Sequence, residues 1–242
     1  MIKPEVFDSS QSLHEAAAEY FIKCYEAAAS EHGSFHVALS GGSTPKKLYQ
    51  LLATEPYSKK VNWQNIHFYF GDERFVAHDS DESNYKMVKT SILDSINCPT
   101  ENIHPVNTTL GSADEAAADY AEVLSNKLPK VENYSVFDLV LLGLGTDGHT
   151  ASLFPDTEIL SVQDRDCAAV YVKKIESWRI SLTFPIINRA KHIMLLSENV
   201  TKSDIVKSLI EWDKPEPNYP IQRVEAQHEM RWLVDRPAAM FI

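Results

Sequence analysis

The chain has 242 residues, 44% of them hydrophobic, and a formal net charge of −11 at pH 7. This length can bury a substantial core, so we expect a single domain over residues 1–242. The acidic balance and the absence of any cluster of five or more Lys/Arg argue against a nucleic-acid surface, although an anionic small molecule could still meet local cations.

The cysteine pattern and the N-terminus indicate a cytoplasmic protein. Cys24, Cys98 and Cys167 are far apart and form no CxxC pair, which is typical of reduced core cysteines and makes a cysteine metal site improbable. The first ten residues lack the apolar segment of a signal peptide, and no run approaches the roughly 18 apolar residues of a membrane span.

Helical and strand-like patterns alternate along the chain. Apolar residues at helical spacing predict a helix over residues 12–32 with Gly33 as its stop signal, followed by a buried strand at 35–39. Further helices are predicted at 48–52, 85–96, 112–128, with a capping box of Ser112 and Glu115, and 201–212. Further strands are predicted at 66–70, 137–144, 167–172, 179–184, 192–196 and 231–234.

This alternation predicts the fold class. Strands that alternate with helices imply parallel pairing by right-handed crossovers, so we expect an α/β three-layer sandwich with a mainly parallel sheet. Ligands of such sheets bind outside the carboxyl ends of the strands. The Pro-rich stretch 213–222 is interpreted as a surface loop rather than a linker.

Six of the eight glycines lie in three places, each directly after a predicted strand: 41–42, Gly71, and the group Gly143, Gly145 and Gly148. Glycine allows positive φ and close approach of a ligand to the backbone. We therefore expect the three loops to converge at one edge of the sheet.

The first loop has the sequence Ser40-Gly41-Gly42-Ser43-Thr44, followed by Pro45. Thr44 is a candidate N-cap and Pro45 suits the first helical position, which would leave free N–H groups facing the loop. The pattern indicates an anion site or, equally, an ordinary turn between strand and helix. It is not a Walker loop, because GxxxxGK[ST] is absent.

The second loop carries three successive charges, Asp72, Glu73 and Arg74. Arg74 offers a fixed fork of donors for a carbonyl or phosphate, and Asp72 could orient a hydroxyl or a histidine. Alternatively, the three form a solvated turn with mutual ion pairs.

The third loop matches GxGxxG at Gly143, Gly145 and Gly148, but Pro155 interrupts any long helix and a basic pair, 173–174, follows the next strand. A dinucleotide site is therefore disfavoured. His149 is better explained as a base that points into the cleft beside N–H donors. A core or capping histidine is the alternative.

Together the segments "LSGGSTP", "GDER", "SNY", "GLGTDGHTASLFP" and "RISLTFPIIN", with a later lysine, resemble the glucosamine-6-phosphate isomerase/6-phosphogluconolactonase family, specifically its 6-phosphogluconolactonases. The resemblance covers almost the whole chain. It implies a glucosamine-6-phosphate deaminase/ribose-5-phosphate isomerase-like fold. It also implies a cofactor-free, metal-free hydrolase that opens 6-phospho-D-glucono-1,5-lactone to 6-phosphogluconate in the oxidative pentose phosphate pathway.

The resemblance suggests roles for the loop residues. His149 would take a proton from the water that attacks the lactone carbonyl, with Asp147 or Asp72 fixing its tautomer. Arg74 and the N–H groups around residues 41–42 are candidates to stabilise the oxyanion.

Phosphate would be held by Arg179 and Lys202. Thr201 and Asp204 fit a capping box that places Lys202 at a helix start, where the dipole disfavours a cation unless an anion is near. A cross-strand pair with Glu176 is the alternative for Arg179.

Two other functions were weighed. The related deaminase carries a Glu five residues after the histidine, where this chain has Phe154, and an aromatic residue in place of Arg74. A regulatory domain that senses sugar phosphates is the second, but no helix-turn-helix segment with a basic face is visible. We expect a monomer that binds a phosphorylated sugar lactone, with no nucleic-acid or membrane partner.

Overall fold

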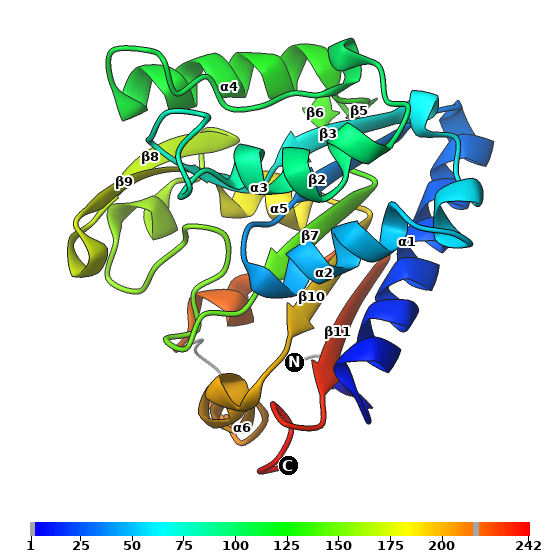
Figure 1. Ribbon diagram of the computed structural model, residues 1–242. Coiled ribbons are helices and arrows are strands. Elements are labelled where there is room, and N and C mark those ends of the chain that lie inside the picture. Colours follow the sequence, from blue (N-terminus) through cyan, green and yellow to red (C-terminus); the bar gives the residue numbers. More distant parts are fainter. Residues whose placement is uncertain (1–2, 215–217) are drawn as a thin grey trace.

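The computed structural model describes residues 3–214 and 218–242. Within these residues, six parallel strands form a central sheet in the order β1-β11-β10-β7-β2-β3 (Figure 1). Their bounds are Glu5–Phe7 for β1, Glu229–Asp235 for β11, His192–Ser197 for β10, Leu139–Gly143 for β7, Phe35–Leu39 for β2 and Ile66–Phe70 for β3. The short edge strand β1 was not predicted.

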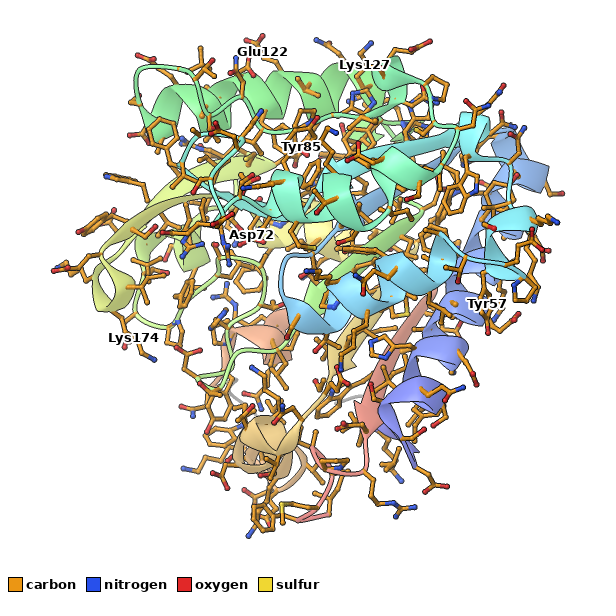
Figure 2. All side chains as sticks on the ribbon, viewed as in Figure 1. Tyr57, Asp72, Tyr85, Glu122, Lys127 and Lys174 are labelled. Carbon is orange, nitrogen blue, oxygen red and sulfur yellow. The ribbon has the colours of Figure 1, made fainter. Side chains whose placement is uncertain are left out.

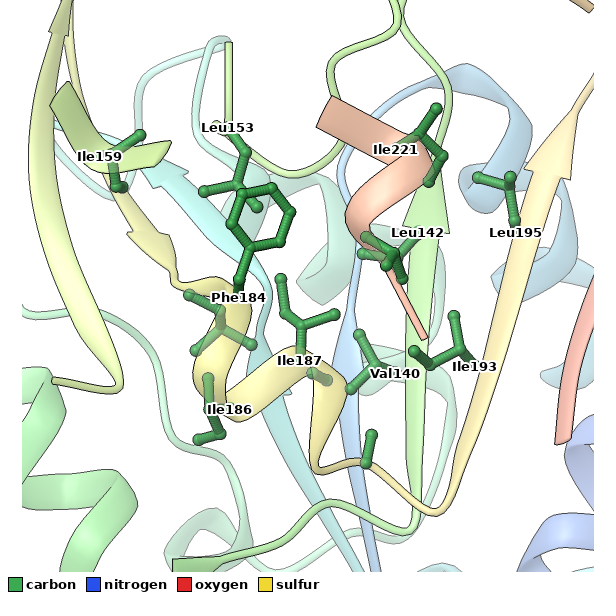
Figure 3. Packing of buried hydrophobic residues seen from close by; sticks show 14 of the residues in the cluster. Val140, Leu142, Leu153, Ile159, Phe184, Ile186, Ile187, Ile193, Leu195 and Ile221 are labelled. Atoms are coloured by element: carbon green, nitrogen blue, oxygen red, sulfur yellow. The ribbon is translucent and has the colours of Figure 1, made fainter. Parts of the chain in front are cut away.

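Helices cover both faces of this sheet because side chains of its buried strands alternate between the faces. On β7, Leu139 and Leu141 pack into one cluster, and Val140 and Leu142 pack into the other. Figure 3 shows Val140 and Leu142 in the second cluster. The first cluster includes residues of α1 (Ser10–His32), α2 (Ser43–Leu52) and α3 (Asn84–Ser91); the second includes residues of α4 (Ala113–Lys127), α5 (Phe184–Asn188) and α6 (Ser203–Ile210). The predicted three-layer α/β sandwich is confirmed.

A second, antiparallel sheet in the order β4-β9-β8 corrects part of the predicted pairing. β8 (Cys167–Val172) and β9 (Ser177–Leu182) form a hairpin, and β4 (Asp72–Arg74) pairs with β9. Only residues 173–176 separate β8 from β9, too few for the crossover that parallel pairing requires. A small hairpin of β5 (Lys130–Val131) and β6 (Tyr134–Ser135) precedes β7.

Several predicted helix starts are wrong in detail. Helix α2 begins at Ser43 with Gly42 as its N-cap, so Thr44 is not the cap and Pro45 is the third helical residue. Proline is tolerated there because the first turn has no intrahelical acceptor for its N–H groups. At α4, Ser112 does cap the helix. The Glu115 carboxylate accepts from the Gly111 N–H and not from Ser112, so the box is incomplete.

The C-terminal elements also differ from their predicted bounds. Asn199, not Thr201, caps the 3-10 turn Val200–Lys202, and α6 follows without a side-chain cap, so the predicted capping box with Asp204 is wrong. Helix α3 ends at Ser91, short of the predicted residue 96. Of the predicted loop 213–222, residues 215–217 lie outside the described part. Pro220 and Ile221 are buried in a 3-10 turn, not on the surface.

Two further features concern the cysteines and the apolar content of the helices. Cys24, Cys98 and Cys167 are all unpaired. Among the helices in residues 3–214 and 218–242, none has the length and apolar content needed to cross a bilayer.

The strand order places a switch point between β2 and β7. From β2 the chain continues to β3 on one side, and from β7 it continues through β10 to β11 on the other. Where neighbouring parallel strands lead away in opposite directions, their carboxyl ends leave a crevice that binds ligands. The loops after β2 and β7 therefore open onto one crevice.

A stack of imidazoles lies on β2 and β3. His36 and His67 are register partners whose parallel rings are 4.5 Å apart, and His67 stacks in turn on His104 at 5.6 Å. His36 also hydrogen-bonds to Tyr69 and Ser34. Burial and the neighbouring His67 lower the pKa of His36 to about 3 and that of His104 to about 4, and burial lowers the pKa of His67.

Acidification should therefore lower the stability of the folded protein, because these histidines resist protonation in the fold. The unfolded chain takes up protons on these histidines near pH ~6.5, but the folded chain does so only near the lower values, so stability is lost as pH falls below ~6.5. At pH 5 we expect a loss of roughly 1–2 kcal/mol in unfolding free energy from His36. Urea unfolding at pH 5 to 8 should show a flatter dependence for His36→Gln, but not for the exposed His228→Gln. Equal slopes in all three proteins would contradict this assignment.

Candidate active site

A cleft of about 330 Å³ opens at the carboxyl ends of the strands, where the three glycine loops meet. All predicted site residues except Asp147 line it; they are Ser40, Gly41, Gly42, Ser43, Thr44, Asp72, Arg74, His149, Arg179 and Lys202. The predicted convergence of the loops is therefore confirmed. Asn84, Ser152 and Glu198 also line the cleft, and sequence reasoning missed them.

His149 is held by a tight loop after β7. The Gly145 N–H donates to the His149 carbonyl at 2.8 Å, and the His149 ring stacks on Phe154 with centroids 3.9 Å apart. Nδ1 lies 2.5 Å from Asp147 Oδ1. Because an ionised carboxylate only accepts, Nδ1 carries the proton, and Nε2 keeps its lone pair. His149 lines the cleft with its side chain 28% exposed, so it is not a core histidine.

Asp147 is ionised at neutral pH. Burial alone would raise the pKa of its carboxyl, but hydrogen bonds from His149 and Lys174 outweigh burial and lower that pKa to about 2. Lys174 Nζ donates to Oδ2 at 3.0 Å, leaving Oδ1 to His149. Asp147 therefore acts on the histidine from behind the cleft rather than on a molecule within it.

Asp72 does not share this role. Its Oδ2 accepts from the Ser152 hydroxyl at 2.7 Å and its Oδ1 from Asn84 Nδ2 at 3.2 Å, and no hydrogen bond joins it to His149. Of the two predicted partners for the histidine, Asp147 is the one in contact. Figure 2 labels Asp72 just below α3. Asp72 remains a fixed carboxylate that can accept a hydrogen bond from a ligand hydroxyl.

The neighbouring Glu73 shows that residues 72–74 are not a solvated turn. Its side chain is buried, and burial raises its pKa. Its carboxylate accepts from the N–H groups of Arg74, Asn84 and Tyr85 and from the Ser83 hydroxyl. Glu73 thereby fastens the start of α3 to β4 and sets the position of the residues on either side of it.

Arg74 and Arg179 are register partners across β4 and β9. Arg74 donates to the Glu82 carbonyl, but the buried Nε atoms of both arginines have no partner within the described residues. Burial, followed by the charge of Arg74, lowers the pKa of Arg179. No contact between Arg179 and Glu176 is present. Two adjacent cations with free donors are suited to a multiply charged anion.

Lys202 adds a third cation to the cleft. Burial lowers its pKa, while the charge of Asp147 acts in the opposite direction. Its Nζ makes no hydrogen bond or ion pair with any residue that the structure describes. Nearby, Glu198 pairs with Lys47 at 2.6 Å and is therefore already neutralised.

The first loop supplies N–H donors. No side chain caps the start of α2, so the donors of its first turn, next to residues 41–44, are available to an anion at the cleft. The backbone N–H and carbonyl of Ser40 are both bound to the Tyr49 hydroxyl, which fixes the loop against its own helix.

The glycines are explained by what lies beside them. A Cβ on Gly145 would lie 2.0 Å from His149 Nδ1, and one on Gly41 would lie 2.0 Å from Asn84 Oδ1. Gly148 has a φ of +75° and also leaves no room beside Tyr219. The sequence pattern alone identifies these positions as special but does not identify the side chains they accommodate.

The described ranges 3–214 and 218–242 contain no group of three or more His, Cys, Asp or Glu placed to bind a metal ion.

The sequence and the fold are similar to those of known proteins. Residues 8–232 match the family model described as glucosamine-6-phosphate isomerases/6-phosphogluconolactonase. A 6-phosphogluconolactonase of Synechocystis is 35% identical over 235 residues, covering 97% of this chain and 95% of its own. The 6-phosphogluconolactonase structure from Trypanosoma brucei is 28% identical with a TM-score of 0.86, covering 99% of both chains. A monomeric glucosamine-6-phosphate deaminase, at 18% identity and a TM-score of 0.84 over 100% of both chains, shares the fold.

Two glycine substitutions in the loop after β7 should show whether Gly145 is needed to make room for the His149 ring. Gly145→Ala should displace the His149 ring and break its bond to Asp147. Gly143→Ala should leave the ring in place, because its Cβ would meet only Ser40 Oγ, at an ordinary 3.7 Å. Crystal structures of both variants would check this. An undisturbed His149 in Gly145→Ala would refute the assignment.

Proposed function

The chain belongs to the glucosamine-6-phosphate isomerase/6-phosphogluconolactonase family and is a lactone hydrolase, and we propose that it opens 6-phospho-D-glucono-1,5-lactone to 6-phosphogluconate by His149-activated attack of water. The observation that carries the proposal is that His149, held by Asp147 from behind, lines the same cleft as Arg74, Arg179 and Lys202. This arrangement combines a base with cations for a phosphorylated substrate.

His149 Nε2 is the proposed base. It accepts a proton from water as the water oxygen bonds to the lactone carbonyl carbon, and Asp147 stabilises the imidazolium that forms. The tetrahedral intermediate then collapses with cleavage of the bond between that carbon and the ring oxygen. The proton held by His149 passes to the departing ring oxygen, which becomes a hydroxyl group, and the new carboxylic acid releases a proton to solvent.

The oxyanion and the phosphate need separate donors. We assign the phosphate to Arg179 and Lys202. The cross-strand position of Arg74 beside Arg179 supports a contribution from Arg74 to the same anion. The N–H groups around residues 41–42 are then the favoured donors for the oxyanion, where one such donor is worth ~3–4 kcal/mol in the transition state. Asp72 would accept a hydrogen bond from a ring hydroxyl.

Deamination of a sugar phosphate is the competing activity on this fold. The residue five positions after His149 is Phe154, and its ring stacks on the imidazole. A phenyl ring cannot accept or deliver a proton at this point, which favours lactone hydrolysis over a reaction that requires a second acid or base beside the histidine.

The proposal extends to the setting of the enzyme. We propose one catalytic domain over residues 1–242 that acts as a cytoplasmic monomer in the pentose phosphate pathway without a cofactor or metal. A chelator should then leave its activity intact.

Removal of the base should abolish most turnover. His149→Ala should lower kcat by roughly 10²–10⁴-fold, the usual contribution of a positioned general base. Proton release after addition of the lactone would measure the rate, corrected for spontaneous hydrolysis. The exposed His228→Ala serves as the control and should behave as wild type. Near-normal kcat in His149→Ala would end the assignment.

Removal of the phosphate cations should affect substrates unequally. Arg179→Ala and Lys202→Ala should each raise KM for the phosphorylated lactone by roughly 10–100-fold, as expected for a lost charge-assisted hydrogen bond. KM for D-glucono-1,5-lactone, which lacks phosphate, should change little. Arg165→Ala is a matched control, because Arg165 is exposed and paired with Asp164. Equal effects on both lactones would rule out phosphate binding at these residues.

A further inference from the structure

Asp147 is held from two sides by residues of different elements. His149 Nδ1 donates to Oδ1 at 2.5 Å, and Lys174 Nζ donates to Oδ2 at 3.0 Å. Lys174 belongs to the turn Lys173–Ile175, which joins β8 to β9. We propose that Lys174 is a positioning residue that orients Asp147 and, through it, the imidazole of His149. The inference rests on the proposed role of His149 as the base.

The contact between Lys174 and Asp147 is better explained by orientation of the carboxylate than by stabilisation of the fold. Its side chain is 69% exposed, so the ion pair contributes little to folding. Asp147 is 25% exposed, however, and without Lys174 only its Oδ1 would be held, by the ring and the backbone N–H of His149. A second donor on the opposite oxygen fixes the plane of the carboxylate, and the plane of the carboxylate sets the direction from which the imidazole is held.

The charge of Lys174, like its hydrogen bond to Asp147, helps to prepare His149 as a base. A carboxylate favours the imidazolium form of an adjacent histidine, and imidazolium cannot accept a proton. The positive charge of Lys174 offsets part of the Asp147 charge and so weakens this preference for the imidazolium form. Lys202 acts on Asp147 at longer range. The charged residues Asp114, Asp156, Glu158 and Lys173 line a hollow together with Asp147 and Lys174, and no hydrogen bond joins any of them to Asp147.

The β8–β9 hairpin therefore serves the site at two points. Its strand β9 carries Arg179 into the cleft, and its turn carries Lys174 to the far side of Asp147. Figure 2 labels Lys174 on the outer side of the molecule, away from the helices α1 and α2. In this proposal, the β8–β9 hairpin thus carries both a residue that binds the phosphate, Arg179, and a residue that orients the base, Lys174.

Lys174→Met and Lys173→Met make a matched pair for the test, because both remove one charge from the same turn and only Lys174 contacts Asp147. The ring of His149 can be followed by NMR of ¹⁵N-histidine protein over pH 5 to 9, with His149→Asn to assign its signals. In Lys174→Met we expect the His149 titration midpoint to rise by roughly 0.2–0.7 pH units, the size of one partly screened charge.

The pH dependence of kcat should change in the same way as the NMR titration of His149. The acidic limb of kcat should move upward by the same amount in Lys174→Met, with KM unchanged, and Lys174→Arg should restore the wild-type limb. No shift in Lys174→Met, or an equal shift in Lys173→Met, would overturn the role of Lys174. Because the NMR titration does not depend on turnover, a fully active His149→Ala would instead refute the proposed base and leave the measured contact standing.

Discussion

The active cleft depends on the point where β2 and β7 lie side by side and lead the chain away in opposite directions. The backbone N–H groups after β2 and the histidine loop after β7 therefore open onto the same cleft. The antiparallel sheet then closes one side, because β4 follows β3 directly and pairs with β9. The residues of the site thus come from three loops and one hairpin, and no single segment carries all of them.

Unpaired charge is concentrated in this cleft. Arg74 and Arg179 lie opposite each other with buried Nε atoms that lack partners, and Lys202 has no partner among the described residues. Elsewhere ion pairs neutralise buried charges, as between Lys191 and Asp138. Like charges held together without partners cost free energy, and a bound dianion recovers it. Although the chain has a net charge of −11, these cations give the cleft a local positive charge that suits an anion.

Glycine and buried carboxylates set the geometry by different means. Gly145 and Gly41 leave room for His149 and Asn84, where any side chain would collide. Glu73 is buried because three backbone N–H groups and a hydroxyl satisfy its oxygens, and it fixes Arg74 on one side and α3 on the other. Asp147 is held by two donors, the His149 ring and the Lys174 ammonium, of which only His149 reaches the cleft. The side chains at the cleft are thus positioned by residues behind it.

Periodicity, glycine placement and motif order depend on near neighbours in the chain, so they determined the sandwich, most strands of its central sheet and the convergence of the three loops, but not β1, Asn84, Ser152 or Glu198. Contacts between distant residues were decided only by the tertiary structure. The pairing of Arg74 with Arg179, the burial of Glu73 and the reach of Lys174 to Asp147 depend on β8 and β9 forming a hairpin, and periodicity does not distinguish a hairpin from strands of a parallel sheet. The choice between Asp147 and Asp72, which the sequence left open, was likewise decided by the fold: Asp147 meets the imidazole, and Asp72 accepts from Ser152 instead.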